Sequence, residues 1–332
     1  MSHSTRRRLA RGIGAALVAA AASATLAVGA AGASTQVTPR AGITVPGDPT
    51  AAPATLVASL EGRNEVTGGD PDGQALELIG IEGNTLSYSV SWRGINTPTE
   101  AAIHAAGRGV DGPVVVPLFT TPSGRGSFAS GSVTVTDPTV LDALRSDPTG
   151  FYTDLRNNDF PNGAVRGQLH QLSHAVSTTG VAALQESVIQ GSQIYACTVQ
   201  LDGSFAFTQN NVEARLTGGI HHTFVQPAAG PPQWQAADGS AVTGTRVVTR
   251  NPNGAGNIAE LDLDATQIGD SSGLLSNAVE VLRLNTVGGV APTGPCDPQA
   301  TPIVNVPYQA DYLFINGWPL RSQEVATRPH LT

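Results

Sequence analysis

The strongest constraint on the fold is a strict alternation of apolar and polar residues over positions 85–93. Leu86, Tyr88, Val90 and Trp92 recur at every second position, and small hydroxyl residues separate them. Because side chains alternate between the two faces of a strand, this pattern predicts a strand with one buried face. Weaker versions recur along the chain between turns, and 38 Gly and 23 Pro supply the turn residues. We therefore predict an all-β protein built from sandwich or barrel domains.

The first 33 residues have the pattern of an export signal. Four arginines among the first eleven residues precede a run rich in Ala, Val and Leu, and Ala31-Gly32-Ala33 fits a cleavage site. A membrane anchor is the alternative, but Ala and Gly favour lipid only weakly. We predict a signal peptide over 1–33, read by either the general or the twin-arginine export route, and a flexible leader over 34–53. The mature protein is then expected to be secreted.

The charge balance excludes two classes of partner. The chain has 18 Arg, no Lys and 26 acidic residues; loss of the four signal arginines leaves 14 against 26, a net charge of −12. Binding of nucleic acid or an anionic membrane requires clustered basic side chains, so neither partner is expected after signal cleavage. An extracellular protein, a glycan or a small molecule remains as the partner class, and no cofactor is indicated.

The stretch 160–169, FPNGAVRGQL, closes the first predicted domain, which covers 54–172. Pro161, Asn162 and Gly163 predict a turn, and a strand follows. Earlier in the domain, Asp137 followed by Pro predicts the start of a short helix.

The first domain resembles a CHRD (chordin-type) domain. The matching residues are Leu60-Glu61-Gly62, Asn64-Glu65-Val66, Leu86, Tyr88, Ile103-His104, the 112–116 block and Arg166-Gly167-Gln168-Leu169. The resemblance implies a β-sandwich and a role in extracellular protein binding. Members of this family commonly carry a His-x-His pair where this chain has Ala102-Ile103-His104, and a further His at the position of Arg156. With one histidine of the three left, no metal site is expected, and His104 is interpreted as a partly buried strand residue.

Arg166, Glu61 and Glu65 form the other notable group in this domain. They are either a binding cluster or a structural ion pair, and we favour the ion pair because an Arg next to a core needs a carboxylate partner.

Residues 173–185 are interpreted as a linker, residues 186–318 as a second β-rich domain with a sandwich or barrel fold, and residues 319–332 as a tail. The second domain contains four recognisable motifs. They are Tyr195-x-Cys197, His222 with Pro232-x-Trp234 and Asp238-Gly239-Ser240, the segment from Arg283 to Cys296, and residues 307–314. In order and spacing they resemble a secreted family known as domain of unknown function 3455. Because no activity is established for that family, the resemblance implies no reaction.

His222, Trp234, Asp238 and Arg283 are the candidate binding residues of the second domain, since an aromatic platform beside charged groups is typical of a pocket. No catalytic residue is predicted. Asp238-Gly239-Ser240 is a turn signal rather than a nucleophile motif.

Cys197 and Cys296 are the two cysteines of the chain. An exported chain favours a disulfide between them, while a pair of buried free thiols and two intermolecular bridges are the alternatives. A zinc site needs more ligands than two cysteines supply.

Two functional hypotheses follow from the sequence. The favoured one is a secreted binding or scaffold protein without catalytic activity. The alternative is an extracellular enzyme that acts on a small molecule or glycan through a pocket in the second domain. The enzyme hypothesis would be favoured if one cavity were lined by all four candidate binding residues, His222, Trp234, Asp238 and Arg283.

Overall fold

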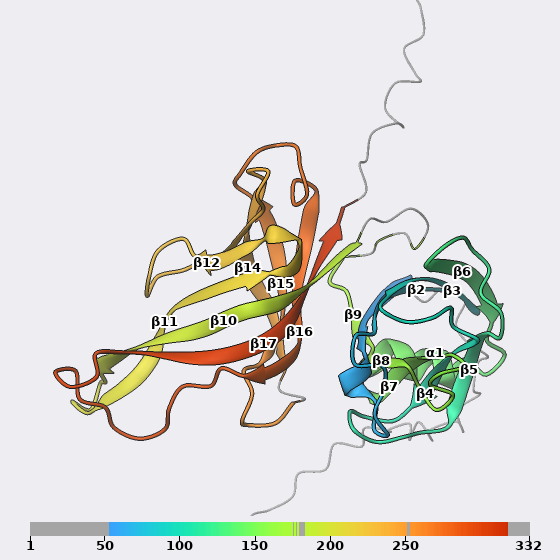
Figure 1. Cartoon of the computed structure of the whole chain (residues 1–332), viewed down its shortest axis with the longest axis horizontal. Coiled ribbons are helices and arrows are strands. Elements are labelled where there is room, and N and C mark those ends of the chain that lie inside the picture. Colours follow the sequence, from blue (N-terminus) through green and yellow to red (C-terminus); the bar gives the residue numbers. More distant parts are fainter. Residues whose placement is uncertain (1–52, 175, 177, 179–182, 251–252, 318–332) are drawn as a thin grey trace, which may run out of the picture. The chain divides into compact units, whose positions relative to one another are not determined.

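In the computed structural model, residues 53–174, 176, 178, 183–250 and 253–317 are described. Strands dominate both halves of the chain, so the predicted all-β class is confirmed (Figure 1). The elements of the first half are β1 (Ala54–Glu61), β2 (Gln74–Glu82), β3 (Thr85–Arg93), β4 (Glu100–Ala105), β5 (Val114–Phe119), β6 (Phe128–Thr134), α1 (Pro138–Ser146), β7 (Phe151–Arg156), β8 (Val165–Gln168) and β9 (His170–Gln171).

These nine strands form one antiparallel sheet in the order β5-β4-β7-β8-β1-β2-β3-β6, with β9 also paired to β1. The sheet curls around a single core, to which strands from both ends of this order contribute. The alternation over 85–93 has the predicted effect, because Leu86, Tyr88, Val90 and Trp92 are all buried in that core. The predicted helix start is also confirmed: Asp137 Oδ1 accepts a hydrogen bond from the amide of Thr139 at 2.9 Å.

The second half of the chain is a closed antiparallel barrel of eight strands. Its strands are β10 (Ala183–Val199), β11 (Phe205–Leu216), β12 (His221–Phe224), β13 (Pro232–Gln235), β14 (Ala241–Arg250), β15 (Glu260–Gln267), β16 (Ala278–Gly288) and β17 (Ile303–Asn316). They follow one another in chain order, and β17 pairs with both β16 and β10, which closes the barrel. Between the two folds left open by the sequence, the structure therefore selects the barrel. Its first strand begins at Ala183, ahead of the start at Glu186 that the sequence predicted.

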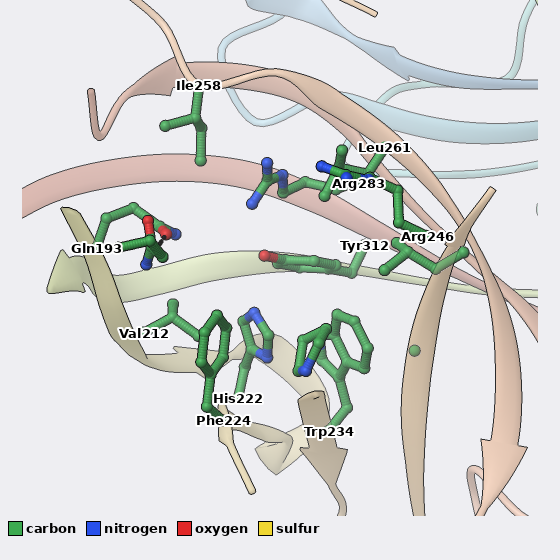
Figure 2. A pocket seen from close by; sticks show the side chains of 14 residues that line it. Gln193, Val212, His222, Phe224, Trp234, Arg246, Ile258, Leu261, Arg283 and Tyr312 are labelled. Carbon is green, nitrogen blue, oxygen red and sulfur yellow. Dashed lines mark hydrogen bonds between the residues drawn. The ribbon is translucent and has the colours of Figure 1, made fainter. Parts of the chain in front are cut away.

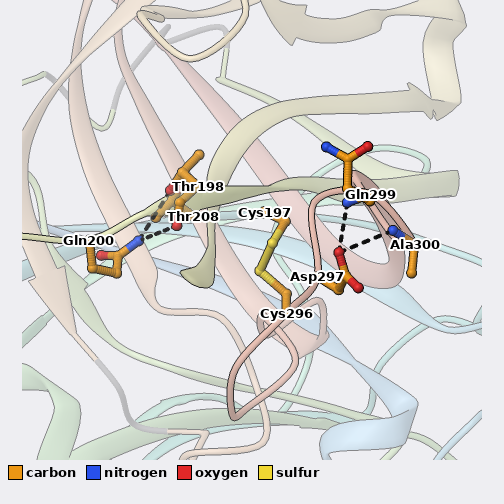
Figure 3. The surroundings of a disulfide bond; sticks show 8 residues. All are labelled: Cys197, Thr198, Gln200, Thr208, Cys296, Asp297, Gln299 and Ala300. Carbon is orange, nitrogen blue, oxygen red and sulfur yellow. Dashed lines mark hydrogen bonds between the residues drawn. A yellow bond between two sulfur atoms is a disulfide. The ribbon is translucent and has the colours of Figure 1, made fainter. Parts of the chain in front are cut away.

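The predicted disulfide between Cys197 and Cys296 is confirmed (Figure 3). It joins the end of β10 to the loop that precedes β17, with the two Cα atoms 5.8 Å apart. Backbone hydrogen bonds hold both ends in place: the Cys197 amide donates to the Pro302 carbonyl at 2.9 Å, and the Cys296 amide donates to the Phe205 carbonyl at 3.2 Å. The bridge thus locks one end of the barrel.

Within the described ranges, no helix is both long and apolar enough to cross a membrane. The predicted signal peptide (1–33), the leader up to residue 52 and the tail (319–332) lie outside the described residues, as do several positions of the predicted linker.

Candidate functional site

The barrel contains a cavity of about 430 Å³ between its walls (Figure 2). Its lining is aromatic and aliphatic, with two glutamines and two arginines among the side chains. The residues that line it are Gln193, Gln209, Val212, His222, Phe224, Pro232, Trp234, Gly244, Arg246, Ile258, Leu261, Leu263, Arg283 and Tyr312.

The register of the short strands builds one wall of this cavity. His222 on β12 lies directly opposite Trp234 on β13, and Ala214 on β11 lies opposite His222 on the other side. Cross-strand neighbours on one face pack together, and here the imidazole stacks on the indole with centroids 4.4 Å apart and an angle of 4° between the planes. Both side chains are buried. The pair forms a stack of two parallel rings on the inner face of the barrel, called here the His222–Trp234 platform.

His222 is held in one neutral form. Its Nδ1 lies 2.8 Å from the carbonyl oxygen of Gln233, so Nδ1 carries the proton and donates, and Nε2 keeps a lone pair. Burial lowers the pKa of His222 to about 3, and the positive charge of Arg283 acts in the same direction. The ring is therefore uncharged at neutral pH and presents an acceptor nitrogen.

The neighbouring part of the wall comes from β16 and β17, where the Tyr312 ring packs edge-on against His222 and Trp234, with centroids 5.1 and 5.4 Å apart. Arg283 and Tyr312 are cross-strand partners there, and Leu261 on β15 is the neighbour of Arg283 on the other side. Figure 2 shows Arg283 above the Tyr312 ring, with the rings of His222, Phe224 and Trp234 below it. Burial raises the pKa of Tyr312, whereas the positive charge of Arg283 opposes the rise. Tyr312 therefore stays a neutral phenol.

Two buried donors on the cavity wall have no acceptor in the described part of the chain. They are Nε2 of Gln193, a residue 4% exposed, and Nε1 of Trp234, a residue 1% exposed. Buried donors without partners are uncommon in folded proteins because each costs free energy. Both side chains line the cavity, although the two nitrogen atoms themselves are not exposed to it.

Three of the four residues predicted to bind lie around this cavity: His222, Trp234 and Arg283. Asp238 does not line it. Its carboxylate is used in the turn between β13 and β14, where it accepts from the amide and the hydroxyl of Ser240 at 3.0 and 2.6 Å and from the amide of Leu274 at 2.7 Å. The interpretation of Asp238-Gly239-Ser240 as a turn is thus confirmed, and this turn uses both carboxylate oxygens of Asp238.

The sequence did not single out several side chains that line the cavity. Tyr312, Phe224, Gln193 and Arg246 were interpreted as ordinary strand residues or were not considered. A signal was present for Arg246, because it has the same parity along β14 as the buried Val242. This shared parity places Arg246 on the inner face of a cavity only if the strands are known to close into a barrel.

The ion pair predicted for Arg166 differs from the one in the structure. Arg166 is 1% exposed, but its partner is Asp111, with Nη1 and Oδ1 3.1 Å apart, rather than Glu61 or Glu65. Glu61 instead pairs with Arg63. The Arg166 guanidinium also donates to the carbonyls of Gly107 and Val110 and lies 3.4 Å from the centre of the Tyr152 ring. The loop before β5 supplies these partners, and strand patterns do not reveal where a loop returns.

We expect Arg166→Ala to lower the free energy of unfolding by about 3 kcal/mol, since a buried charge network loses its cation. The carbonyls of Gly107 and Val110 would lose their donor, and Tyr152 would lose its stacked partner. Urea unfolding of the full chain measures the loss. Arg125→Ala is the matched control because Arg125 is exposed in the same domain. Equal midpoints for the two variants would contradict the structural role.

His104, the remaining histidine of the family pattern, is buried with both ring nitrogens in use. Nδ1 lies 2.9 Å from the Gly112 carbonyl, and Nε2 lies 3.0 Å from Oδ1 of Asp154. Arg156 donates from Nε to the same Asp154 at 2.9 Å. Across the described residues, no three His, Cys, Asp or Glu side chains are grouped in a way that could hold a metal ion.

Comparison with known families agrees with this architecture. The family model of the CHRD domain matches residues 56–169, and that of a protein of unknown function (DUF3455) matches residues 217–316. The two-domain resemblance seen in the sequence is thereby confirmed. No curated protein and no solved structure matches the chain at a significant level.

Proposed function

We propose that this chain is a secreted binding protein whose barrel takes up one small, largely apolar molecule. The observation that carries the proposal is the cavity of about 430 Å³ with the His222–Trp234 platform on its wall. Pockets for small ligands have volumes of roughly 300–1,000 Å³ and mostly apolar linings. Closed eight-stranded barrels are of the size that holds one such ligand.

The lining favours binding over catalysis. Its residues include no Ser, Thr, Cys, Lys, Asp or Glu, the types that usually act as nucleophile or proton carrier. His222 is a poor general base, since a group with a pKa of about 3 holds a proton too weakly at neutral pH. We therefore prefer the binding hypothesis to the enzyme hypothesis for this cavity.

Export is supported by two independent features. One is the disulfide, which persists in oxidising compartments. The other is the export pattern of the first 33 residues. A secreted binding protein would meet its ligand outside the cytoplasm, where the CHRD domain is available for a separate contact.

Binding can be measured with N-phenyl-1-naphthylamine, a neutral apolar fluorophore that brightens on leaving water. We expect saturable binding to the full mature chain. Ile258→Trp should weaken it at least about tenfold, because the larger ring fills the cavity that Ile258 lines. Ile303→Trp is the matched control, since Ile303 is 47% exposed on β17.

Absence of probe binding, or equal affinity of the two tryptophan variants, would contradict the proposal. Near-ultraviolet circular dichroism shows whether each variant keeps its fold. Phe224→Ala provides a second test in case Ile258→Trp fails to fold. It removes a half-buried ring from the cavity wall and should also change the affinity.

A further inference from the structure

We infer that the ligand of the barrel is an amphiphilic anion, with a rigid apolar body and one carboxylate or sulfonate group that Arg283 binds. The inference rests on the proposed function and adds the chemical class of the ligand. It comes from the charges of the cavity and the fixed position of Arg283.

The charges of the cavity are all positive. Its lining includes Arg246 and Arg283 and no acidic residue, although the whole chain has 26 acidic residues and 18 Arg. In the described part of the chain, neither of these two arginines forms an ion pair. Five described arginines do, namely Arg63, Arg108, Arg145, Arg156 and Arg166, and four others outside the cavity (Arg93, Arg125, Arg215 and Arg250) do not. Arg246 is exposed and Arg283 is half-buried, and a half-buried guanidinium without a counter-ion attracts an anion.

Arg283 is held in position before any ligand arrives. Its Nε and Nη2 donate to the carbonyl oxygen of Ala259 at 3.0 and 2.8 Å. The guanidinium also interacts with the Tyr312 hydroxyl, so an anionic ligand would share Arg283 with this phenol. A side chain fixed in this way loses little conformational entropy on binding.

Gln193 and Trp234 line the same cavity. Figure 2 shows the guanidinium of Arg283 above the hydroxyl end of Tyr312, on the side of the cavity where Gln193 lies. Gln193 therefore lies on the same side of the cavity as the guanidinium. Trp234 and His222 form an aromatic platform of the cavity, which suits the rigid apolar body.

Two probes with the same ring system test the inference. 1-Anilinonaphthalene-8-sulfonate carries one sulfonate, and N-phenyl-1-naphthylamine is the same molecule without it. Because a charge-assisted hydrogen bond in a half-buried site adds affinity, we expect the full mature chain to bind the sulfonate probe at least about tenfold more tightly than the neutral probe. Arg283→Met should abolish this preference while the affinity for the neutral probe stays within about threefold.

Arg283→Lys separates binding from a merely structural role. It keeps the positive charge and loses the paired bonds to Ala259, so we expect it to retain part of the preference for the anion. Equal behaviour of the Lys and Met variants would assign Arg283 a structural role and overturn the inference. Arg215→Met is the control, because Arg215 is exposed on β11 and does not line the cavity.

The remaining outcomes separate the two proposals. Tight binding of the neutral probe with no preference for the sulfonate overturns the anion inference and leaves the proposed function standing. Failure of both probes to bind contradicts the proposed function itself and, with it, the inference. Loss of preference in Arg215→Met as well as in Arg283→Met would point to general surface charge and would also overturn the inference.

Discussion

Removing the disulfide is expected to destabilise the barrel by about 4–5 kcal/mol and to leave the CHRD domain nearly unchanged. Cys197 and Cys296 are 99 positions apart, so the bridge closes a long loop of the unfolded chain. Opening that loop returns conformational entropy to the unfolded state, and the gain grows with loop length. The CHRD domain has no cysteine and gains nothing of this kind.

The double variant Cys197→Ser, Cys296→Ser measures the effect without a reductant. Hydrogen exchange followed by mass spectrometry reports each domain separately in the full chain. Protection should fall in the barrel strands β10 and β17, which flank the bridge, and persist in β2 and β3 of the CHRD domain. Two alkylatable thiols in the unreduced, denatured wild-type protein would show that the bridge does not form.

The second large effect is a pH dependence of stability caused by Glu77. This carboxyl group is fully buried in the curled sheet of the first domain, and neither oxygen has a hydrogen-bond partner in the described part of the chain. Burial raises the pKa of Glu77 to about 8, and the nearby hydroxyl of Thr153 opposes the rise. The folded protein therefore holds a proton that the unfolded chain releases above its ordinary pKa of 4.5.

The sign of the effect follows from this difference. The folded pKa is above the unfolded pKa, so the stabilising contribution is complete below about pH 4.5 and is lost as the pH rises to about 8. The loss over this window is about 4 kcal/mol. Glu77→Gln keeps the shape and removes the titration, so it should match the wild type at pH 4.5 and exceed its stability at pH 8.5.

Urea unfolding of the full chain at several pH values measures this difference. Burial also raises the pKa of Glu65 to about 8, so the wild-type curve alone does not isolate one residue. The comparison with Glu77→Gln does isolate it, and Glu82→Gln, exposed at the end of the same strand, is the matched control. Parallel pH profiles for wild type and Glu77→Gln would show that Glu77 is ionised or solvated in the folded protein.

Local patterns in the sequence predicted the strand class, the helix start and the disulfide. The alternation over 85–93 identified the buried face of one strand, because this face is set by neighbouring positions in the sequence alone. The same reasoning did not predict the burial of Glu77. Its parity with the apolar Ala75 and Ile79 on β2 places it on the inner face, but a local pattern does not specify that a carboxylate there stays without a partner.

The candidate site was predictable only in part, because it depends on how distant strands are paired. His222 and Trp234 share a sequence block, and the register of adjacent strands brings them together. Arg283 and Tyr312 meet through pairing of β16 with β17, which the sequence does not specify. Asp238 was included because it is charged and close to Trp234 in the sequence, but a turn uses its carboxylate.

A crystal structure with 1-anilinonaphthalene-8-sulfonate bound tests the central claim, that the barrel cavity is the ligand site. We predict the naphthalene ring inside the barrel beside Trp234, with the sulfonate within hydrogen-bond distance of Arg283. An empty cavity in a crystal where the probe occupies only the outer surface would contradict the claim.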